Sequence, residues 1–206
     1  MLVNKLVTGM KMTREDFLRA WDDSPELKNA ELIEGIVYVP PPVSPSHGFY
    51  DSLIHAWLVI YASSKRELEA GNNATWMMLE SAPQPDAHLR RLPEFGGQSR
   101  IAENKFFGAP ELAVEICVTS REVDFGPKLA LYQRAGVREY ITLETLIPRV
   151  EWRVLDGGSY RSLKPDDDGV YRSESFPGLW LNTKAFWARD SAAVIATVQQ
   201  GIAANA

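Results

Sequence analysis

The chain has 206 residues, of which 45% are hydrophobic and 24% are charged, and this length and composition are typical of one globular domain with a sizeable core. Its net charge of −5 argues against a protein that binds nucleic acid over a broad basic surface, but does not exclude a local basic face. The single cysteine excludes an internal disulfide, and the chain has neither a membrane-length apolar run nor the apolar core of a signal peptide, so we expect a cytoplasmic protein without a membrane segment.

The first third of the chain predicts a short helix, a hairpin and a long helix. Thr13 is typical of an N-cap and is followed by a short amphipathic stretch. Residues 30–42 (AELIEGIVYVPPP) alternate apolar and polar side chains around a Glu-Gly turn at 34–35, which indicates two short strands. Ser and Pro at 44–45 predict the start of a long helix, which we expect to end at residues 71–73.

The middle of the chain predicts two strands, a loop and a βαβ unit. Residues 74–81 and 85–90 are candidate strands, and residues 92–108 are polar and contain glycine, which favours a long functional loop or lid. Residues 110–143 then show an apolar strand, a helix with Pro at its start and Gly at its end, and the strand EYITL. Such a crossover unit joins two parallel strands.

The C-terminal part predicts a peripheral antiparallel extension and one or two closing helices. Residues 150–163 form a hairpin pattern with an Asp-Gly-Gly turn, and residues 166–171 indicate another turn. Helices are expected between residues 183 and 200, and the Ala-rich tail after them is expected to fray.

Glu115 is unusual because it stands in the middle of an apolar run, GAPELAVEICVTS (residues 108–120). On a strand it shares one face with Ala113 and Cys117, and these small neighbours leave room beside the carboxylate. A buried charge without a partner is costly, and a metal ion is one partner that would compensate it. Cys117 itself is expected to be a packed core thiol.

Two further charged residues are expected near Glu115. Lys128 lies in the first turn of the predicted crossover helix, on the face that should pack against the sheet, although the helix dipole disfavours a cation there. Asp86 begins a predicted strand directly after a proline and shares its face with His88. Two carboxylates and a lysine that converge in this way are the equipment of metal-assisted phosphodiester cleavage.

Each of these residues also has a structural interpretation. Asp86 suits a turn or a cap, and Glu115 suits an ion pair with Lys128, which does not exclude a catalytic role. His47 and His88 are candidate helpers of the site, but a packing or surface role is the more ordinary explanation for each. The histidines lack zinc-binding spacing, and the chain has no serine-hydrolase elbow and no glycine-rich phosphate loop.

Six segments in order resemble the Uma-type putative restriction endonuclease family, which is part of the PD-(D/E)-x-K nuclease superfamily. The resemblance spans residues 13–190. The segments are ELIEG, PPPVSPSH, QPDAHL, GAPELAVEI, DFGPKLALYQRAGVREY and FPGLWL. It implies one restriction-endonuclease-like α/β domain over residues 1–206, with a mixed β-sheet flanked by helices, a core at about 13–190 and a flexible C-terminal tail.

The resemblance also implies a site and a cofactor. Asp86 and Glu115 would be the two acids of the motif, Glu34 the upstream acid, and Mg²⁺ or Mn²⁺ the metal that these three residues bind. The superfamily lysine normally lies two residues after the second acid, where this chain has Cys117, so the resemblance points to Lys128 from the following helix. Val118 is a further departure, because many relatives have a polar residue there.

Three functions remain open on the sequence. The first is a metal-dependent endonuclease that hydrolyses DNA and acts as a homodimer, since related folds cut two strands in this way. The second is a catalytically silent binding or assembly protein that keeps the nuclease fold, which the acidic net charge and the missing adjacent lysine favour. The third is a metal-dependent hydrolase with another substrate.

Overall fold

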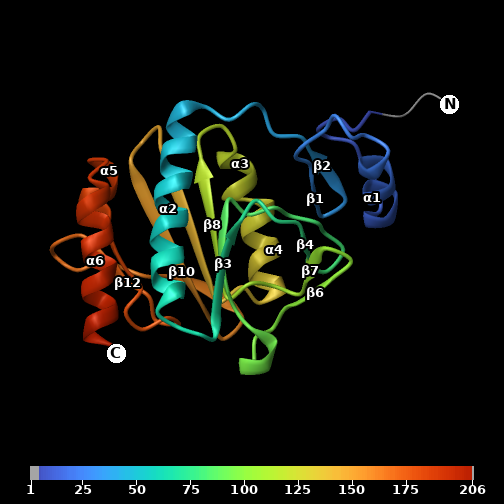
Figure 1. Ribbon diagram of the computed structural model, residues 1–206. Helices are drawn as coiled ribbons and strands as arrows, with labels where there is room; N and C mark the ends of the chain where they lie inside the picture. The colour runs from blue at the N-terminus through green and yellow to red at the C-terminus, as the bar shows by residue number, and fades with distance from the viewer. Residues whose placement is uncertain (1–4, 206) are drawn as a thin grey trace.

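A six-stranded mixed sheet is the centre of the computed structural model, which describes residues 5–205. The strand order is β11-β10-β9-β8-β5-β3, and only β8 and β9 run parallel to each other. This arrangement confirms the predicted α/β fold with a mixed sheet flanked by helices (Figure 1). The strands are β3 (Leu68–Asn72), β5 (Ala87–Arg91), β8 (Leu112–Cys117), β9 (Glu139–Glu144), β10 (Arg149–Asp156) and β11 (Ser159–Ser162).

One face of this sheet is covered by α2 (Pro45–Ser63), with α6 (Ser191–Ala204) on the same side of the molecule (Figure 1). The core between these layers is apolar and aromatic, and the rings of Trp57 and Trp152 meet edge to face at 6.0 Å. The start of α2 agrees with the sequence, because the Ser44 hydroxyl accepts the first-turn hydrogen bond of His47 and Pro45 follows it. The short helix α5 (Thr183–Trp187) and the hairpin of β12 (Val170–Arg172) and β13 (Trp180–Asn182) complete this side.

The opposite face is covered by the crossover between β8 and β9, formed by α3 (Arg121–Asp124) and α4 (Pro127–Ala135). Pro127 opens α4, and Gly136, with a φ of +85°, ends it. The predicted βαβ unit is therefore confirmed. Lys128, Leu131 and Tyr132 are the buried side chains of α4, so this face of the sheet receives polar groups as well as apolar ones.

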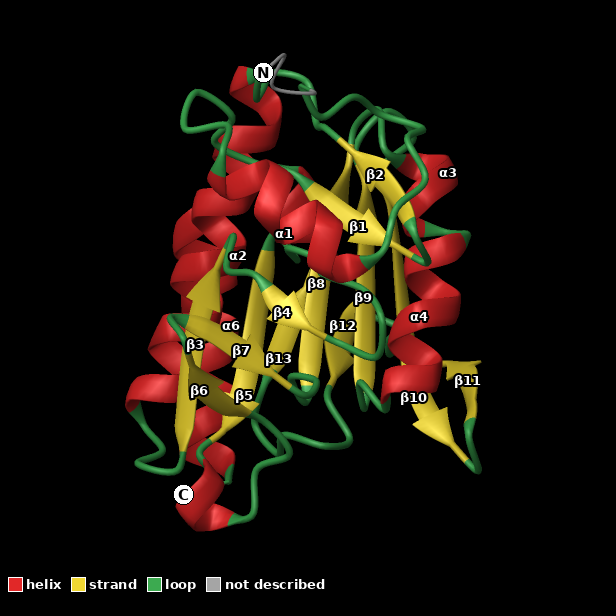
Figure 2. Ribbon diagram, turned by 90° about the vertical axis from the view of Figure 1, so that its right-hand side faces the viewer, coloured by secondary structure: helices red, strands yellow, loops and turns green. Residues whose placement is uncertain are grey.

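A smaller unit lies beside the α4 face and includes the N-terminal elements (Figures 1 and 2). A backbone bridge between Leu32 and Ala82 connects its hairpin to the segment that precedes β5. This connection matters for the site, since it holds the first strand of the hairpin near the start of α4. The elements are α1 (Arg14–Asp22), the hairpin β1 (Glu31–Ile33) and β2 (Ile36–Tyr38), and the sheet of β4 (Trp76–Met77), β7 (Lys105–Phe107) and β6 (Arg100–Ala102).

Three local predictions are wrong. The long helix ends at Ser63 rather than at residues 71–73, which lie at the end of β3 and in the turn after it. Residues 92–108 are not a plain loop, because they contain the short helix η1 (Pro93–Phe95) and strands β6 and β7. The tail that was expected to fray is helical to Ala204, and Gly201 packs directly on the backbone of Gly178.

Other predictions agree with the structure. The hairpin at residues 150–163 is formed by β10 and β11, which extend the central sheet in antiparallel fashion. Cys117 is a buried free thiol. Among residues 5–205, no helix is long and apolar enough to cross a membrane.

Candidate active site

A cavity of about 680 Å³ opens at the carboxyl end of β8, where several elements meet. Its walls include the end of β8, the residue before β5, the first turn of α2, the α3–α4 segment, β1 and the prolines that follow β2. The acidic and basic residues that line it are Glu31, His47, Asp51, Asp86, Glu115, Asp124 and Lys128.

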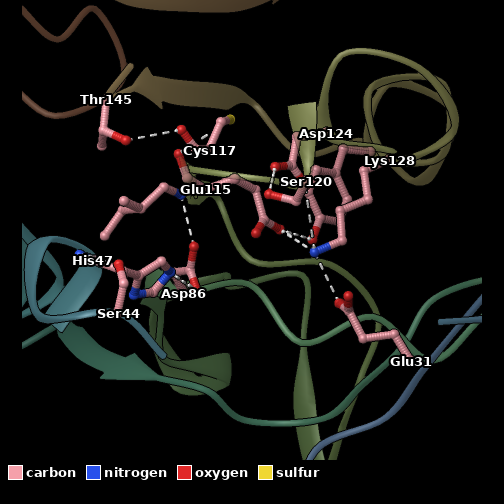
Figure 3. Close-up of polar contacts among 12 residues, drawn as sticks. Glu31, Ser44, His47, Asp86, Glu115, Cys117, Ser120, Asp124, Lys128 and Thr145 are labelled. Atoms are coloured by element: carbon pink, nitrogen blue, oxygen red, sulfur yellow. Dashed lines mark hydrogen bonds and ion pairs between the residues drawn. The ribbon is translucent and has the colours of Figure 1, made fainter. Parts of the chain in front are cut away.

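Glu115 and Lys128 form the centre of this site (Figure 3). The Lys128 ammonium lies 3.0 Å from Oε1 of Glu115, and the Tyr132 hydroxyl donates a 2.7 Å hydrogen bond to the same oxygen. All three side chains are buried. Within residues 5–205 no hydrogen bond uses the other oxygen of Glu115, Oε2.

Two more carboxylates surround the lysine. Glu31 of β1 lies 2.9 Å from the Lys128 ammonium and accepts a 2.6 Å hydrogen bond from the backbone N–H of Gln84. Asp124, at the end of α3, lies 3.8 Å from the ammonium and accepts a hydrogen bond from the Ser120 hydroxyl. Lys128 is thus held by carboxylates from three different elements, which explains how a cation can be buried in the first turn of a helix.

Asp86 lies at the other side of the cavity and is fixed by β8 and α2. Its Oδ2 accepts a 2.6 Å hydrogen bond from the backbone N–H of Ile116, the residue after Glu115. Its Oδ1 lies 3.4 Å from Nε2 of His47, which projects from the first turn of α2. Asp86 and Glu115 are therefore brought to one cavity from neighbouring strands, as the sequence predicted.

The electrostatics of the cluster favour an additional cation. Burial raises the pKa of Glu115 well above its usual value, against the opposing effect of Lys128, and it also raises the pKa values of Glu31 and Asp124. Burial alone would lower the pKa of Lys128, but the carboxylates, with Glu115 first, outweigh it and raise that pKa. The lysine therefore stays protonated, and one ammonium does not neutralise the carboxylates around it.

Two of the predicted site residues lie elsewhere. Glu34 is at the turn between β1 and β2, with a φ of +53°, and pairs with Arg134 outside the cavity. His88 lies under the smaller sheet against Trp76 and Phe106, where burial lowers its pKa to about 3. Neither side chain lines the cavity.

Sequence reasoning missed Glu31 and Asp124. The hairpin pattern contained a signal for Glu31, because alternation places Glu31 and Ile33 on one face and leaves residue 34 in the turn. Asp124 had the weaker signal of preceding Lys128 by four residues, the spacing of neighbours on a helical surface.

The donor chemistry of the site fits a hard divalent ion. Asp86 and Glu115 present carboxylate oxygens to the same cavity, and Mg²⁺ is commonly held by one or two carboxylates together with water and substrate phosphate. Within residues 5–205, no group of three or more His, Cys, Asp or Glu side chains is arranged to hold a metal ion. The residues that fit such an ion are therefore the pair Asp86 and Glu115.

The comparisons with known proteins agree with this fold. The profile of the Uma2 family, described as a putative restriction endonuclease, matches residues 14–184. The chain belongs to this family. A solved structure of a putative nuclease from Anabaena variabilis is similar to 86% of this chain and to 98% of its own, with a TM-score of 0.68 and 16% sequence identity. The search of curated proteins found no significant match.

Proposed function

We propose that the protein is a metal-dependent endonuclease that hydrolyses phosphodiester bonds in DNA. The observation that carries this proposal is the meeting of Asp86, Glu115 and Lys128 in one cavity at the carboxyl end of β8. Membership in a family described as putative restriction endonucleases supports the reaction class. The likeness to the Anabaena structure supports the fold.

Asp86 and Glu115 are the residues that would hold Mg²⁺ or Mn²⁺. Such an ion, when bound, polarises the phosphate and lowers the pKa of a bound water. Both carboxylates are already oriented by contacts within the protein. The Ile116 N–H fixes one oxygen of Asp86, while Tyr132 and Lys128 fix Oε1 of Glu115. Glu115 is thus oriented through Oε1, whereas Asp86 is oriented through both oxygens, since its Oδ1 lies 3.4 Å from Nε2 of His47.

Lys128 supplies the positive charge of the site. Its ammonium is buried beside Glu115 at the cavity wall, where a charge acts more strongly than in water. We assign it two roles, which are to orient Glu115 and to offset the negative charge that develops on the phosphate in the transition state. His47 acts as a positioning residue for Asp86.

The test is cleavage of supercoiled and linear DNA with Mg²⁺ or Mn²⁺. Asp86→Asn and Glu115→Gln should each lower kcat/KM by at least about a hundredfold, which corresponds to about 2.7 kcal/mol of transition-state stabilisation. Glu34→Gln is the matched control. It also removes one carboxylate, but Glu34 lies at the β1–β2 turn, outside the cavity. If all three variants cleave DNA equally well, Asp86 and Glu115 are not the residues that hold the metal.

A second candidate is a catalytically silent protein that uses the nuclease fold for binding or assembly. The observation that favours it is the state of Lys128, which is engaged by Glu31 and Glu115 in a way that a purely structural ion pair would also show. The two candidates differ in metal binding. A silent scaffold should be indifferent to Mn²⁺ and should cleave no DNA under any metal condition.

A further inference from the structure

Three arginines gather around the ring of Phe125, directly after α3. The guanidinium carbons of Arg121, Arg149 and Arg153 lie 4.9, 5.5 and 5.2 Å from the centre of that ring. Arg121 follows Ser120, which lines the cavity, so this cluster borders the candidate active site. It is a local basic face in a protein of net charge −5.

Two of these guanidiniums, those of Arg121 and Arg149, contact carboxylates and still have unused N–H donors. Glu144, with a side chain only 9% exposed, lies 2.7 Å from Nε of Arg121 and 3.4 Å from Nε of Arg149. The side chains of Arg121 and Arg149 are 55% and 45% exposed, and neither makes a hydrogen bond through its terminal Nη atoms within residues 5–205. A guanidinium that lies over a ring and faces a carboxylate at Nε keeps its Nη groups available to bind a phosphate.

Arg153 and Glu151 complete the cluster. Arg153 is only 12% exposed and donates to the Thr142 hydroxyl at 3.0 Å, so it is the buried member of the three arginines around the ring. Glu151 lies 3.5 Å from Nε of Arg149 and 3.9 Å from Arg153. The two glutamates therefore lie closest to Nε of Arg149, and the exposed Nη side of Arg121 and Arg149 stays basic.

The turn between β9 and β10 carries an exposed apolar pair beside these arginines. Leu146 and Ile147 are 76% and 69% exposed, the two highest values among the large apolar residues that are exposed within residues 5–205. Thr145 anchors the turn, because its N–H and its hydroxyl both donate to the carbonyl of Cys117, at 3.1 and 3.2 Å. Figure 3 shows this contact at the end of β8, close to Glu115.

We propose that this surface, formed by Arg121, Arg149, Leu146 and Ile147, is a DNA-contact surface that engages the duplex next to the cleavage site. The two guanidiniums bind backbone phosphates, and the apolar pair inserts between base steps as a wedge. Charge complementarity supports phosphate binding at the arginines, and exposed apolar residues flanked by basic ones are the equipment with which proteins unstack and kink a duplex. The inference rests on the proposed nuclease function.

Binding is measured in EDTA, so that cleavage does not contribute, by fluorescence anisotropy of a DNA duplex at several salt concentrations. The duplex carries 2-aminopurine at one base step, and the fluorescence of this base reports unstacking. The double variant Arg121→Gln/Arg149→Gln should weaken binding and reduce the slope of log K against log salt by about 1 for each arginine. Leu146→Ser/Ile147→Ser should keep the salt slope and lose the 2-aminopurine signal of unstacking. Both should hydrolyse bis(p-nitrophenyl) phosphate with Mn²⁺ as the wild type does.

Matched controls exist elsewhere on the chain. Arg66 also lies over an aromatic ring, at 5.4 Å from the centre of Phe95, and Ile101 is 56% exposed on β6. Arg66→Gln and Ile101→Ser should leave binding unchanged. Urea unfolding midpoints of all variants establish that each is folded before its affinity is compared.

The outcomes separate this proposal from the proposed function. If the wild type cleaves DNA while both double variants bind like the controls, the contact surface is refuted and the nuclease remains. If the arginine variant weakens binding while no metal supports cleavage by the wild type, the nuclease is refuted and the surface remains. A turn variant that changes the sedimentation coefficient without changing DNA affinity would identify a contact between copies of the chain and overturn the proposal.

Discussion

The two ends of the parallel strands β8 and β9 both bury carboxylates, but in opposite ways. At the amino end, Glu111 and Glu139 lie side by side, joined by a backbone hydrogen bond of 3.0 Å. Both are almost fully buried, and neither has an ion pair within residues 5–205. Their donors are the backbone N–H groups of Arg91 and Gln98 for Glu111, and Trp152 Nε1, the Ser173 hydroxyl and the Ser175 N–H for Glu139.

At the carboxyl end, Glu115 has few neutral donors and faces other carboxylates across a cavity. Glu31, Asp124 and Asp86 lie near it, and Lys128 is the buried cation that contacts it. A buried carboxylate stabilises the fold when fixed N–H groups donate to both of its oxygens. Carboxylates that repel each other are typical of sites where a bound ligand removes the repulsion. The comparison therefore predicts that the acids at the amino end are structural and that those at the carboxyl end serve the proposed site.

The largest expected effect is at Lys128. Lys128→Met should destabilise the protein by about 3–5 kcal/mol at neutral pH, because it leaves buried carboxylates without their cation. Urea unfolding measures this. The double variant Lys128→Met/Glu115→Gln should recover part of the loss, since it also removes one of the repelling charges. A single variant as stable as the wild type would show that the ion pairs contribute nothing.

The second-largest expected effect is that of metal binding, which should distinguish the two ends of β8 and β9. Saturating Mn²⁺ should stabilise the wild type by about 2.7 kcal/mol at a hundredfold excess over Kd, as for any ligand of the folded state. Asp86→Asn should lose this shift in Tm, while its metal-free form should melt no lower than the wild type. A wild-type Tm indifferent to Mn²⁺, together with a destabilised Asp86→Asn, would favour the silent scaffold.

Matched Glu→Gln substitutions test the comparison directly. Glu139→Gln should cost about 1–3 kcal/mol, because an amide cannot accept from all the buried donors that the carboxylate satisfies. Glu115→Gln should be neutral or stabilising without metal, because Tyr132 can still donate to the amide oxygen and a repelling charge is gone. Equal losses in urea unfolding experiments would mean that both glutamates are structural.

The smallest expected effect is a difference between two histidines in NMR titration. The pKa of His88 is lowered to about 3 by burial, so its ring should stay neutral from pH 8 to below pH 4. Because the unfolded state takes up this proton near pH 6.5, the stability that neutral His88 contributes is lost as pH falls from 6.5 toward 3.

His47 should behave in the opposite way. Its hydrogen bond to Asp86 raises its pKa above 6.5, so its contribution to stability is present below pH 6.5 and is lost as pH rises through the folded pKa. Asp86→Asn should bring its titration down toward 6.5. An unshifted His47 in the wild type would contradict the contact with Asp86.

Much of the fold could be predicted from local signals. Ser44 and Pro45 define the start of α2, Pro127 and Gly136 bound α4, and the apolar run with Glu115 defines β8. These signals act within a few residues, through capping, fixed φ angles and alternation of side chains, so a single sequence contains them. The same alternation placed Glu115 on the face that α4 covers, and hence predicted its meeting with Lys128.

Other features depend on partners that are distant along the chain. Residues 100–107 become strands because β7 pairs with β4, some thirty residues earlier, which no local pattern reveals. Glu31 rather than Glu34 enters the site because the bridge from Leu32 to Ala82 fixes the hairpin beside α4 and leaves Glu34 in a left-handed turn. His88 is excluded from the site because the smaller sheet covers it.

The sequence by itself therefore determined the βαβ unit, the helix starts and the two acids and lysine of the site, because each follows from spacing along one element. Only the tertiary structure decided which upstream acid joins them, that Asp124 and Tyr132 support the cluster, and that three arginines gather on one ring beside an exposed turn. The physical reason is that side-chain direction within an element is a local property, whereas convergence of elements depends on long-range strand pairing and core packing.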